Sequence, residues 1–147
     1  MSLKQLNTLL KFEQDKEQKT VQALQQAEKD YQDNLQRLAN VGDFRLEYMK
    51  RVSERSQTGI DSATYGHYHA FINKLDNAAK QVEIALHQAK ALVEQRKKQW
   101  LNQRQKVQAV EHLRAKQQAK QTIKAAKQEQ KMFDEIATQQ FIRRNHQ

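Results

Sequence analysis

The stretch from Ile72 to Val110, INKLDNAAKQVEIALHQAKALVEQRKKQWLNQRQKVQAV, carries the pattern on which the fold depends. Apolar residues recur in a column every seven residues, and a second column follows three residues after the first. The first column is Ile72, Ala79, Leu86, Val93, Trp100 and Val107, and the second is Leu75, Val82, Ala89, Arg96, Gln103 and Val110. This 3.5-residue average spacing is the period of a coiled-coil seam. So narrow a seam needs a partner helix, since alone it would expose a long apolar stripe to water.

The composition favours long helices over a compact fold of many short elements. The 147 residues include no proline, no cysteine and only three glycines, so turns are scarce. The abundant residues are strong helix formers. Disulfides and thiolate metal sites are excluded. No apolar run is long enough to span a bilayer, and the N-terminus lacks the apolar core of a signal peptide. A cytoplasmic location is the simplest expectation.

A first helix is expected over residues 2–57, with Ser2 as its N-cap. Its column of residues seven apart contains one charged residue, Glu17. The column is Leu3, Leu10, Glu17, Leu24, Tyr31 and Leu38. Turn-forming residues then cluster, which places a bend over residues 58–62. Gly59 is expected to end the first helix in the left-handed conformation, and Asp61 or Ser62 to cap a second helix over residues 62–143.

One short bend makes the two helices antiparallel neighbours, so facing residues should have numbers that sum to about 117. Leu10 then faces Val107, and Glu17 faces Trp100. Trp100 is a seam residue in this arrangement, or it marks a loosened place where a partner engages. The expected fold is all-α: a single antiparallel two-helix coiled coil, or long α-hairpin, over residues 1–147, in which residues 116–143 overhang the first helix.

The positive charge gathers in this C-terminal part. Residues 1–89 hold 12 basic and 12 acidic residues, whereas residues 90–147 hold 14 and 5. Residues 116–143 contain five lysines and a minority of apolar residues: Lys116, Lys120, Lys124, Lys127, Lys131, Ile123, Met132, Phe133, Ile136, Phe141 and Ile142. Such a helix is marginal alone and fits best inside a partner. The charge suggests that the partner is acidic: the mouth of a protein, an anionic membrane or nucleic acid.

No motif for catalysis or metal binding is present. The five histidines are isolated or lie on different helix faces, and a two-helix rod has no concave pocket. Gly-rich phosphate loops and nucleophile motifs are missing. We therefore predict no catalytic residues, no metal site, no cofactor and no enzymatic activity.

Apolar residues near the bend exceed what a two-helix seam needs. Phe71, Leu75 and Ala78 follow i, i+4, i+7 spacing, and Phe44 and Tyr48 can approach them from the first helix. An exposed patch of this kind marks an interaction site, whereas a wider local core would steady the bend. The residues alone leave both interpretations open.

Taken together, the chain resembles the FliJ family, the general component of the flagellar type III export apparatus. The likeness rests on the length, the Leu-rich first helix and four motifs. These are Gly59-Ile60-Asp61-Ser62 at the bend, Tyr68-His69-Ala70-Phe71-Ile72-Asn73-Lys74-Leu75 with Ala78 after it, Trp100 among basic residues, and the tail Gln130-Lys131-Met132-Phe133-Asp134-Glu135-Ile136-Ala137.

The resemblance implies a coiled coil similar to the central stalk of rotary ATPases. It implies that the end formed by the termini is held in the hexameric export ATPase FliI, and that the bend contacts the export gate protein FlhA. The gate-binding residues would be Phe71, Leu75 and Ala78, with Tyr48 and Phe44 nearby. The ATPase-binding residues would be Leu6, Leu10, Lys116, Lys120, Ile123, Lys124, Lys127, Lys131 and Phe133.

The expected function is a non-enzymatic coupling role in flagellar protein export, and hence in motility and chemotaxis. The resemblance further implies contact with export chaperones and a peripheral position at the cytoplasmic face of the membrane, without insertion. An injectisome stalk protein of the same architecture is one alternative. A basic, helical nucleic-acid-binding protein is another, and it predicts binding that weakens steeply with salt.

Overall fold

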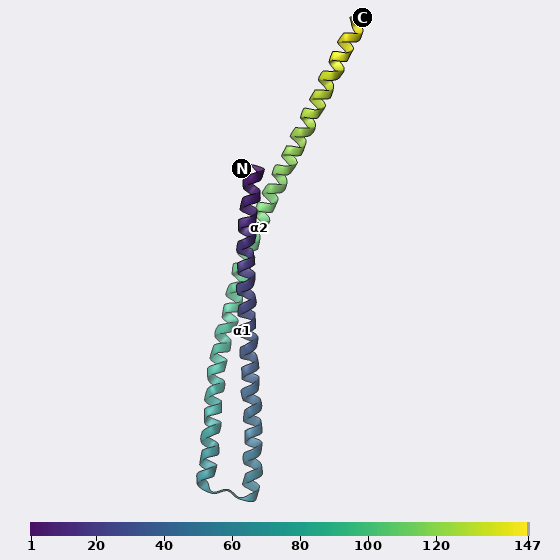
Figure 1. The fold of residues 1–147 in the computed structure, drawn as a ribbon. Helices are drawn as coiled ribbons and strands as arrows, with labels where there is room; N and C mark the ends of the chain where they lie inside the picture. Colours follow the sequence, from purple (N-terminus) through teal and green to yellow (C-terminus); the bar gives the residue numbers. More distant parts are fainter. Residues whose placement is uncertain (147) are drawn as a thin grey trace. The chain divides into compact units, whose positions relative to one another are not determined.

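The computed structural model describes residues 1–146, which form two helices and no strand. Helix α1 spans Leu3–Thr58 (56 residues) and helix α2 spans Ser62–Asn145 (84 residues). They pack as an antiparallel helical hairpin, as the seam predicted (Figure 1). Both helices run without interruption through their internal glycines, Gly42 and Gly66. The aromatic-rich start of α2 around Gly66 is helical, since one glycine costs a helix only about 1 kcal/mol.

The chain divides into two compact units. The bend unit is Lys19–Leu101, which includes the bend and the parts of both helices that adjoin it. The terminal unit is Met1–Gln18 together with residues 102–146.

Helix α1 begins with a capping box. The backbone N–H of Gln5 donates to Ser2 Oγ at 3.2 Å, and the backbone N–H of Ser2 donates to Gln5 Oε1 at 3.0 Å. This reciprocal pair satisfies two donors that a helix start leaves without partners. Ser2 is therefore the N-cap, as predicted.

The bend uses the residues that its backbone requires. Gly59 has a φ of 87°, and no other described residue has a positive φ. Asp61 caps α2, because its Oδ1 accepts a hydrogen bond from the backbone N–H of Thr64 at 3.1 Å. Hydrogen bonds from Thr64 to the ionised form lower the pKa of the Asp61 carboxyl below its ordinary value. Asp61, rather than Ser62, is thus the cap.

We expect Gly59→Ala to destabilise the hairpin by about 1 kcal/mol, because a Cβ disfavours the left-handed conformation. The matched control is Gly42→Ala, in mid-helix, where open space surrounds an added Cβ. That change should stabilise by roughly 0.5–1 kcal/mol. Urea unfolding followed by circular dichroism measures both free energies of unfolding. Equal effects of the two substitutions would contradict a conformational role for Gly59.

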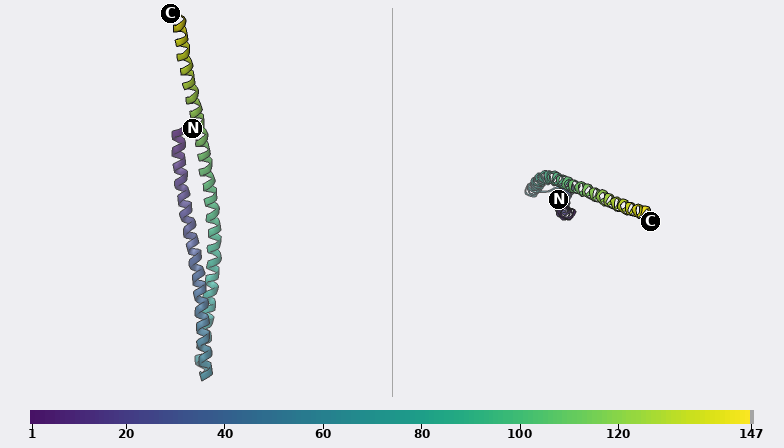
Figure 2. Two further views of the ribbon diagram at one scale, coloured as in Figure 1. Left: turned by 90° about the vertical axis from the view of Figure 1, so that its right-hand side faces the viewer. Right: turned by 90° about the horizontal axis from the view of Figure 1, so that it is seen from above.

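In the bend unit the core consists only of the contact between α1 and α2. Ala27 and Ile72 are the buried apolar residues here, and most other seam residues keep part of their surface in water. The blue part of α1 and the teal part of α2 run alongside each other in both orientations of the ribbon (Figures 1 and 2). Each seam residue has one neighbouring helix and no third element to cover it, so partial burial follows from the architecture.

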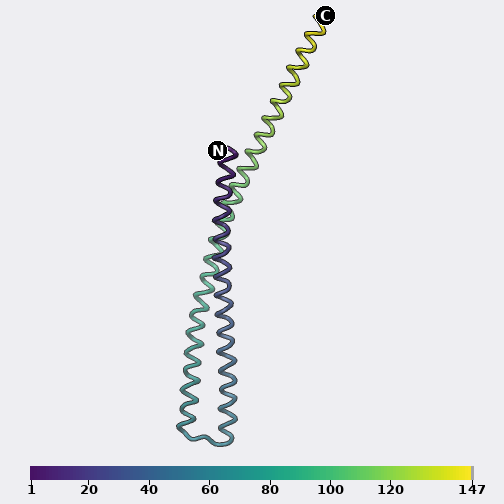
Figure 3. The backbone as a smooth tube through the Cα atoms, viewed as in Figure 1, coloured from purple at the N-terminus to yellow at the C-terminus, as the bar shows by residue number. Residues whose placement is uncertain are grey.

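The terminal unit holds most of the buried residues. Leu10 and Val107 pack together with Val110 and are only 5% and 3% exposed. This contact confirms the predicted pairing of Leu10 with Val107. Figure 3 shows the N-terminal segment ending beside α2, while the green-to-yellow part of α2 continues beyond it. We call residues 121–146, every one of which is exposed, the overhang.

Candidate interaction surfaces

Four aromatic rings from both helices meet in the bend unit. The Tyr48 ring lies 4.5 Å from Phe71 and 5.4 Å from Tyr68, measured between ring centroids. Phe44 lies 6.1 Å from Phe71, edge to face, and 6.5 Å from Tyr48. We call these four residues the aromatic cluster. Such ring pairs add roughly 0.5–1.5 kcal/mol each beyond their buried area, so the cluster stabilises the helix pair.

The predicted gate-binding residues fall into two groups. Tyr48, Phe71 and Leu75 are half-buried, and the first two are ring partners within the cluster. Phe44 is 50% exposed, and Ala78 is also exposed. The sequence left open whether these residues form an exposed interaction site or a wider local core. Both interpretations apply, each to different residues. Tyr48 and Phe71 pack the helices together, while Phe44 and Ala78 present apolar surface to solvent.

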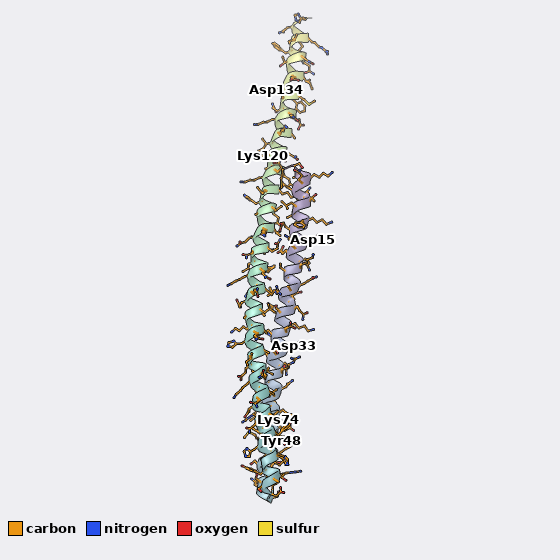
Figure 4. All side chains as sticks on the ribbon, turned by 90° about the vertical axis from the view of Figure 1, so that its left-hand side faces the viewer. Asp15, Asp33, Tyr48, Lys74, Lys120 and Asp134 are labelled. Atoms are coloured by element: carbon orange, nitrogen blue, oxygen red, sulfur yellow. The ribbon has the colours of Figure 1, made fainter. Side chains whose placement is uncertain are left out.

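Polar pairs that the sequence did not predict flank this cluster. Arg45 Nε donates to Asp76 Oδ1 across the helix pair at 2.6 Å, and Arg55 Nη1 donates to Tyr68 Oη at 2.9 Å. Each of these residues lies next to an apolar seam or cluster residue in the sequence, or one turn from it. The sequence does contain a signal for the Arg45–Asp76 pair. A basic residue directly follows Phe44, and an acidic residue directly follows Leu75. Figure 4 labels Tyr48 and Lys74 on the two helices of this region.

The second surface is the overhang with the lysines that precede it. Ile123 is 56% exposed and lies in a shallow groove formed with the stems of lysine side chains. The other residues of this groove are Lys120, Lys124, Lys127, Gln128 and Lys131. Phe133 is 60% exposed. One isoleucine, one glutamine and four lysines line the groove, which suits a partner with apolar contacts and acidic side chains.

The predicted ATPase-binding residues do not all lie on this surface. Leu6 and Leu10 are buried in the helix pair of the terminal unit. Lys116 is exposed and borders a groove with Met1, Leu6 and Leu113. The side chains available to a partner are therefore those of the lysines, Ile123 and Phe133, whereas the two leucines hold α1 against α2.

A polar layer interrupts the seam of the terminal unit. Gln103 is buried, and its Nε2 donates to the backbone oxygen of Glu13 at 2.9 Å and to the Glu13 carboxylate. Glu17 accepts a hydrogen bond from Arg104 Nη1 at 3.1 Å. The charge that Glu17 brings to the seam is thus compensated by a basic residue. Polar seam residues with specific partners help to set register in coiled coils.

The described residues form neither a metal cluster nor a membrane-spanning helix. Within residues 1–146, no three histidine, aspartate or glutamate side chains lie close enough together to hold a metal ion. None of the helices in this range has a stretch that is both long and apolar enough to cross a membrane. Binding through the two surfaces is the activity that the geometry supports.

Comparison with known proteins agrees with this architecture. The profile of the family described as "Flagellar FliJ protein" matches residues 1–146. The chain is also similar to the flagellar FliJ protein of Salmonella typhi, with 28% identity over 102 residues, which cover 69% of each chain. No solved structure matches it.

Proposed function

Because this chain belongs to the FliJ family, it is a component of the flagellar export apparatus, and we propose that it links the hexameric export ATPase FliI to the export gate protein FlhA. In this role the protein is a non-enzymatic coupling rod that acts at the cytoplasmic face of the membrane. It assists the export of substrates that chaperones deliver. The match to a flagellar family favours this function over an injectisome or a nucleic-acid-binding one.

The observation that carries the proposal is the overhang. All 26 of its residues are exposed, although they include Ile123, Phe133 and Phe141. The stability of helices in proteins comes mainly from packing an apolar face against a partner, and these residues have no such partner within the described chain. A ring that surrounds the overhang would provide such packing, and acidic residues in the ring would neutralise the lysines.

The exposed part of the aromatic cluster supports the gate contact. Phe44 and Ala78 offer apolar surface on α1 and α2, and the half-buried Tyr48 and Phe71 rings hold Phe44 in place. Leu75 lies on the same stripe of α2 as Phe71 and Ala78. Aromatic side chains of this kind dominate the binding energy of protein interfaces.

A three-component pull-down tests the link. The cytoplasmic part of the gate protein is immobilised, and the ATPase is applied with or without the chain. We expect the ATPase to be retained only when the chain is present. Phe44→Ala combined with Ala78→Asp should weaken retention of the chain at least about tenfold, since it removes one aromatic contact and adds a charge to the interface.

The matched control is Leu46→Ala, which removes an exposed apolar side chain two residues from Phe44, on another face of α1. It should leave retention unchanged. Melting curves of all variants show whether the hairpin stays intact. Retention of the ATPase by the gate without the chain, or an effect of Leu46→Ala equal to that of the double variant, would contradict the proposal.

A further inference from the structure

Residues 119–137, in the overhang and directly before it, carry a second apolar stripe at coiled-coil spacing. Its members follow one another at intervals of four and three residues: Ala119, Ile123, Ala126, Gln130, Phe133 and Ala137. All six are exposed. This alternation is the a/d pattern of a helix that packs against another helix. We call these six residues the outer stripe.

The outer stripe lies on the opposite face of α2 from the seam that packs on α1. The seam follows the buried Gln103, Val107 and Val110 and continues through the half-buried Arg114 and Gln117. The outer stripe begins at Ala119, two positions after Gln117. Because an α-helix turns by about 100° per residue, two positions rotate the stripe by about 200°. A longer α1 would therefore not cover the outer stripe.

We propose that the outer stripe pairs with the outer stripe of a second copy of this chain, in antiparallel orientation. A register that pairs a with d positions places Ile123 opposite Phe133 of the second copy, and Phe133 opposite its Ile123. Ala119 then lies opposite Ala137, and Ala126 opposite Gln130. The two largest side chains thus pack against each other on either side of the central Ala126–Gln130 pairs, and alanines meet at both ends of the contact.

The charges beside the stripe select this orientation. In the antiparallel register each Lys120 lies beside Asp134 of the other copy, which gives two pairs of opposite charge, whereas Lys127 faces Lys127 and Glu129 faces Glu129 at the centre of the contact. A parallel pair would place Glu129 beside Asp134, two like charges. Lys120 and Asp134, both labelled in Figure 4, form no ion pair within residues 1–146. They are fourteen residues, or roughly 21 Å, apart on α2.

Self-pairing goes beyond the proposed function and does not rest on it. It would remove the Ile123 and Phe133 side chains from water when no other partner is bound. The same side chains are candidates for contact with the ATPase, so a bound second copy and the ATPase would exclude each other. In the dimer, the apolar side chains of the overhang are therefore shielded from water.

The test uses the full chain alone. Its weight-average mass is measured by sedimentation equilibrium at low salt, over about 5 to 500 µM, a range suited to a short and weak contact. We expect the mass to rise from 17.3 kDa towards twice that value. Phe133→Lys should keep the chain monomeric. Met132→Lys, the matched control at an exposed position outside the stripe, should not.

A charge swap tests the orientation. Lys120→Glu and Asp134→Lys should each weaken dimerisation by about threefold to tenfold, because each change affects two symmetric pairs. The double variant should restore it. A monomer at every concentration, or a dimer insensitive to Phe133→Lys, overturns the proposal. A dimer that depends on Phe133 but is not restored by the double variant overturns the antiparallel register. None of these outcomes involves the ATPase, so they stand apart from the proposed coupling role.

Discussion

We expect the full chain to stimulate ATP hydrolysis by the export ATPase, and a chain that ends at Lys120 to lose all of this stimulation while its hairpin stays folded. The truncation removes the overhang, whose described residues are all exposed, and leaves the buried residues of both units in place. It also removes Ile123 and Phe133, the apolar residues we expect to anchor the contact with the ATPase. Initial rates of ATP hydrolysis, measured against the concentration of added chain, should remain at the rate of the ATPase alone.

Melting temperatures of two truncated chains show whether a loss of stimulation reflects the missing overhang rather than unfolding of the hairpin. A chain that ends at Leu113 also loses Lys116, Gln117 and Lys120, which line the groove beside Met1 and Leu6. It should melt at a lower temperature than the chain that ends at Lys120, which should match the full chain closely. Undiminished stimulation by the chain that ends at Lys120 would show that the ATPase binds elsewhere on this protein.

Val107→Asp is expected to detach the N-terminal part of α1 from α2. Val107 packs with Leu10 and Val110, and these three are the buried cluster of the terminal unit. A carboxylate there loses its hydration without gaining a partner, which costs at least about 3 kcal/mol. We expect a large drop in the urea concentration at the midpoint of unfolding and a loss of helix signal.

The control for this substitution is Gln105→Asp, two residues away on an exposed face of the same helix. It introduces the same charge and should change the free energy of unfolding by less than about 0.5 kcal/mol. Similar midpoints for the two variants would mean that the Leu10–Val107 contact contributes little, and that the terminal unit is held by other interactions.

The sequence located much of the candidate surface. It did not show which of these residues pack between the helices and which remain exposed. The i, i+4, i+7 pattern placed Phe71, Leu75 and Ala78 on one stripe, and the length of the second helix predicted an overhang. The pattern did not show that the Phe71 ring contacts both Phe44 and Tyr48, since those contacts cross between helices. The resemblance to the FliJ family also implied that Leu6 and Leu10 bind the ATPase, whereas both side chains are buried in the helix pair.

The sequence by itself determined the two helices, the bend and the pairing of Leu10 with Val107. Heptad spacing, capping residues and a glycine able to adopt a positive φ are local properties, and they act wherever they occur in the chain. Only the tertiary structure decided which residues remain exposed and which polar groups meet. The Gln103–Glu13 and Arg104–Glu17 contacts depend on side-chain rotamers across two helices. Exposure of a side chain likewise depends on what the neighbouring helix places beside it, which no periodicity within one helix records.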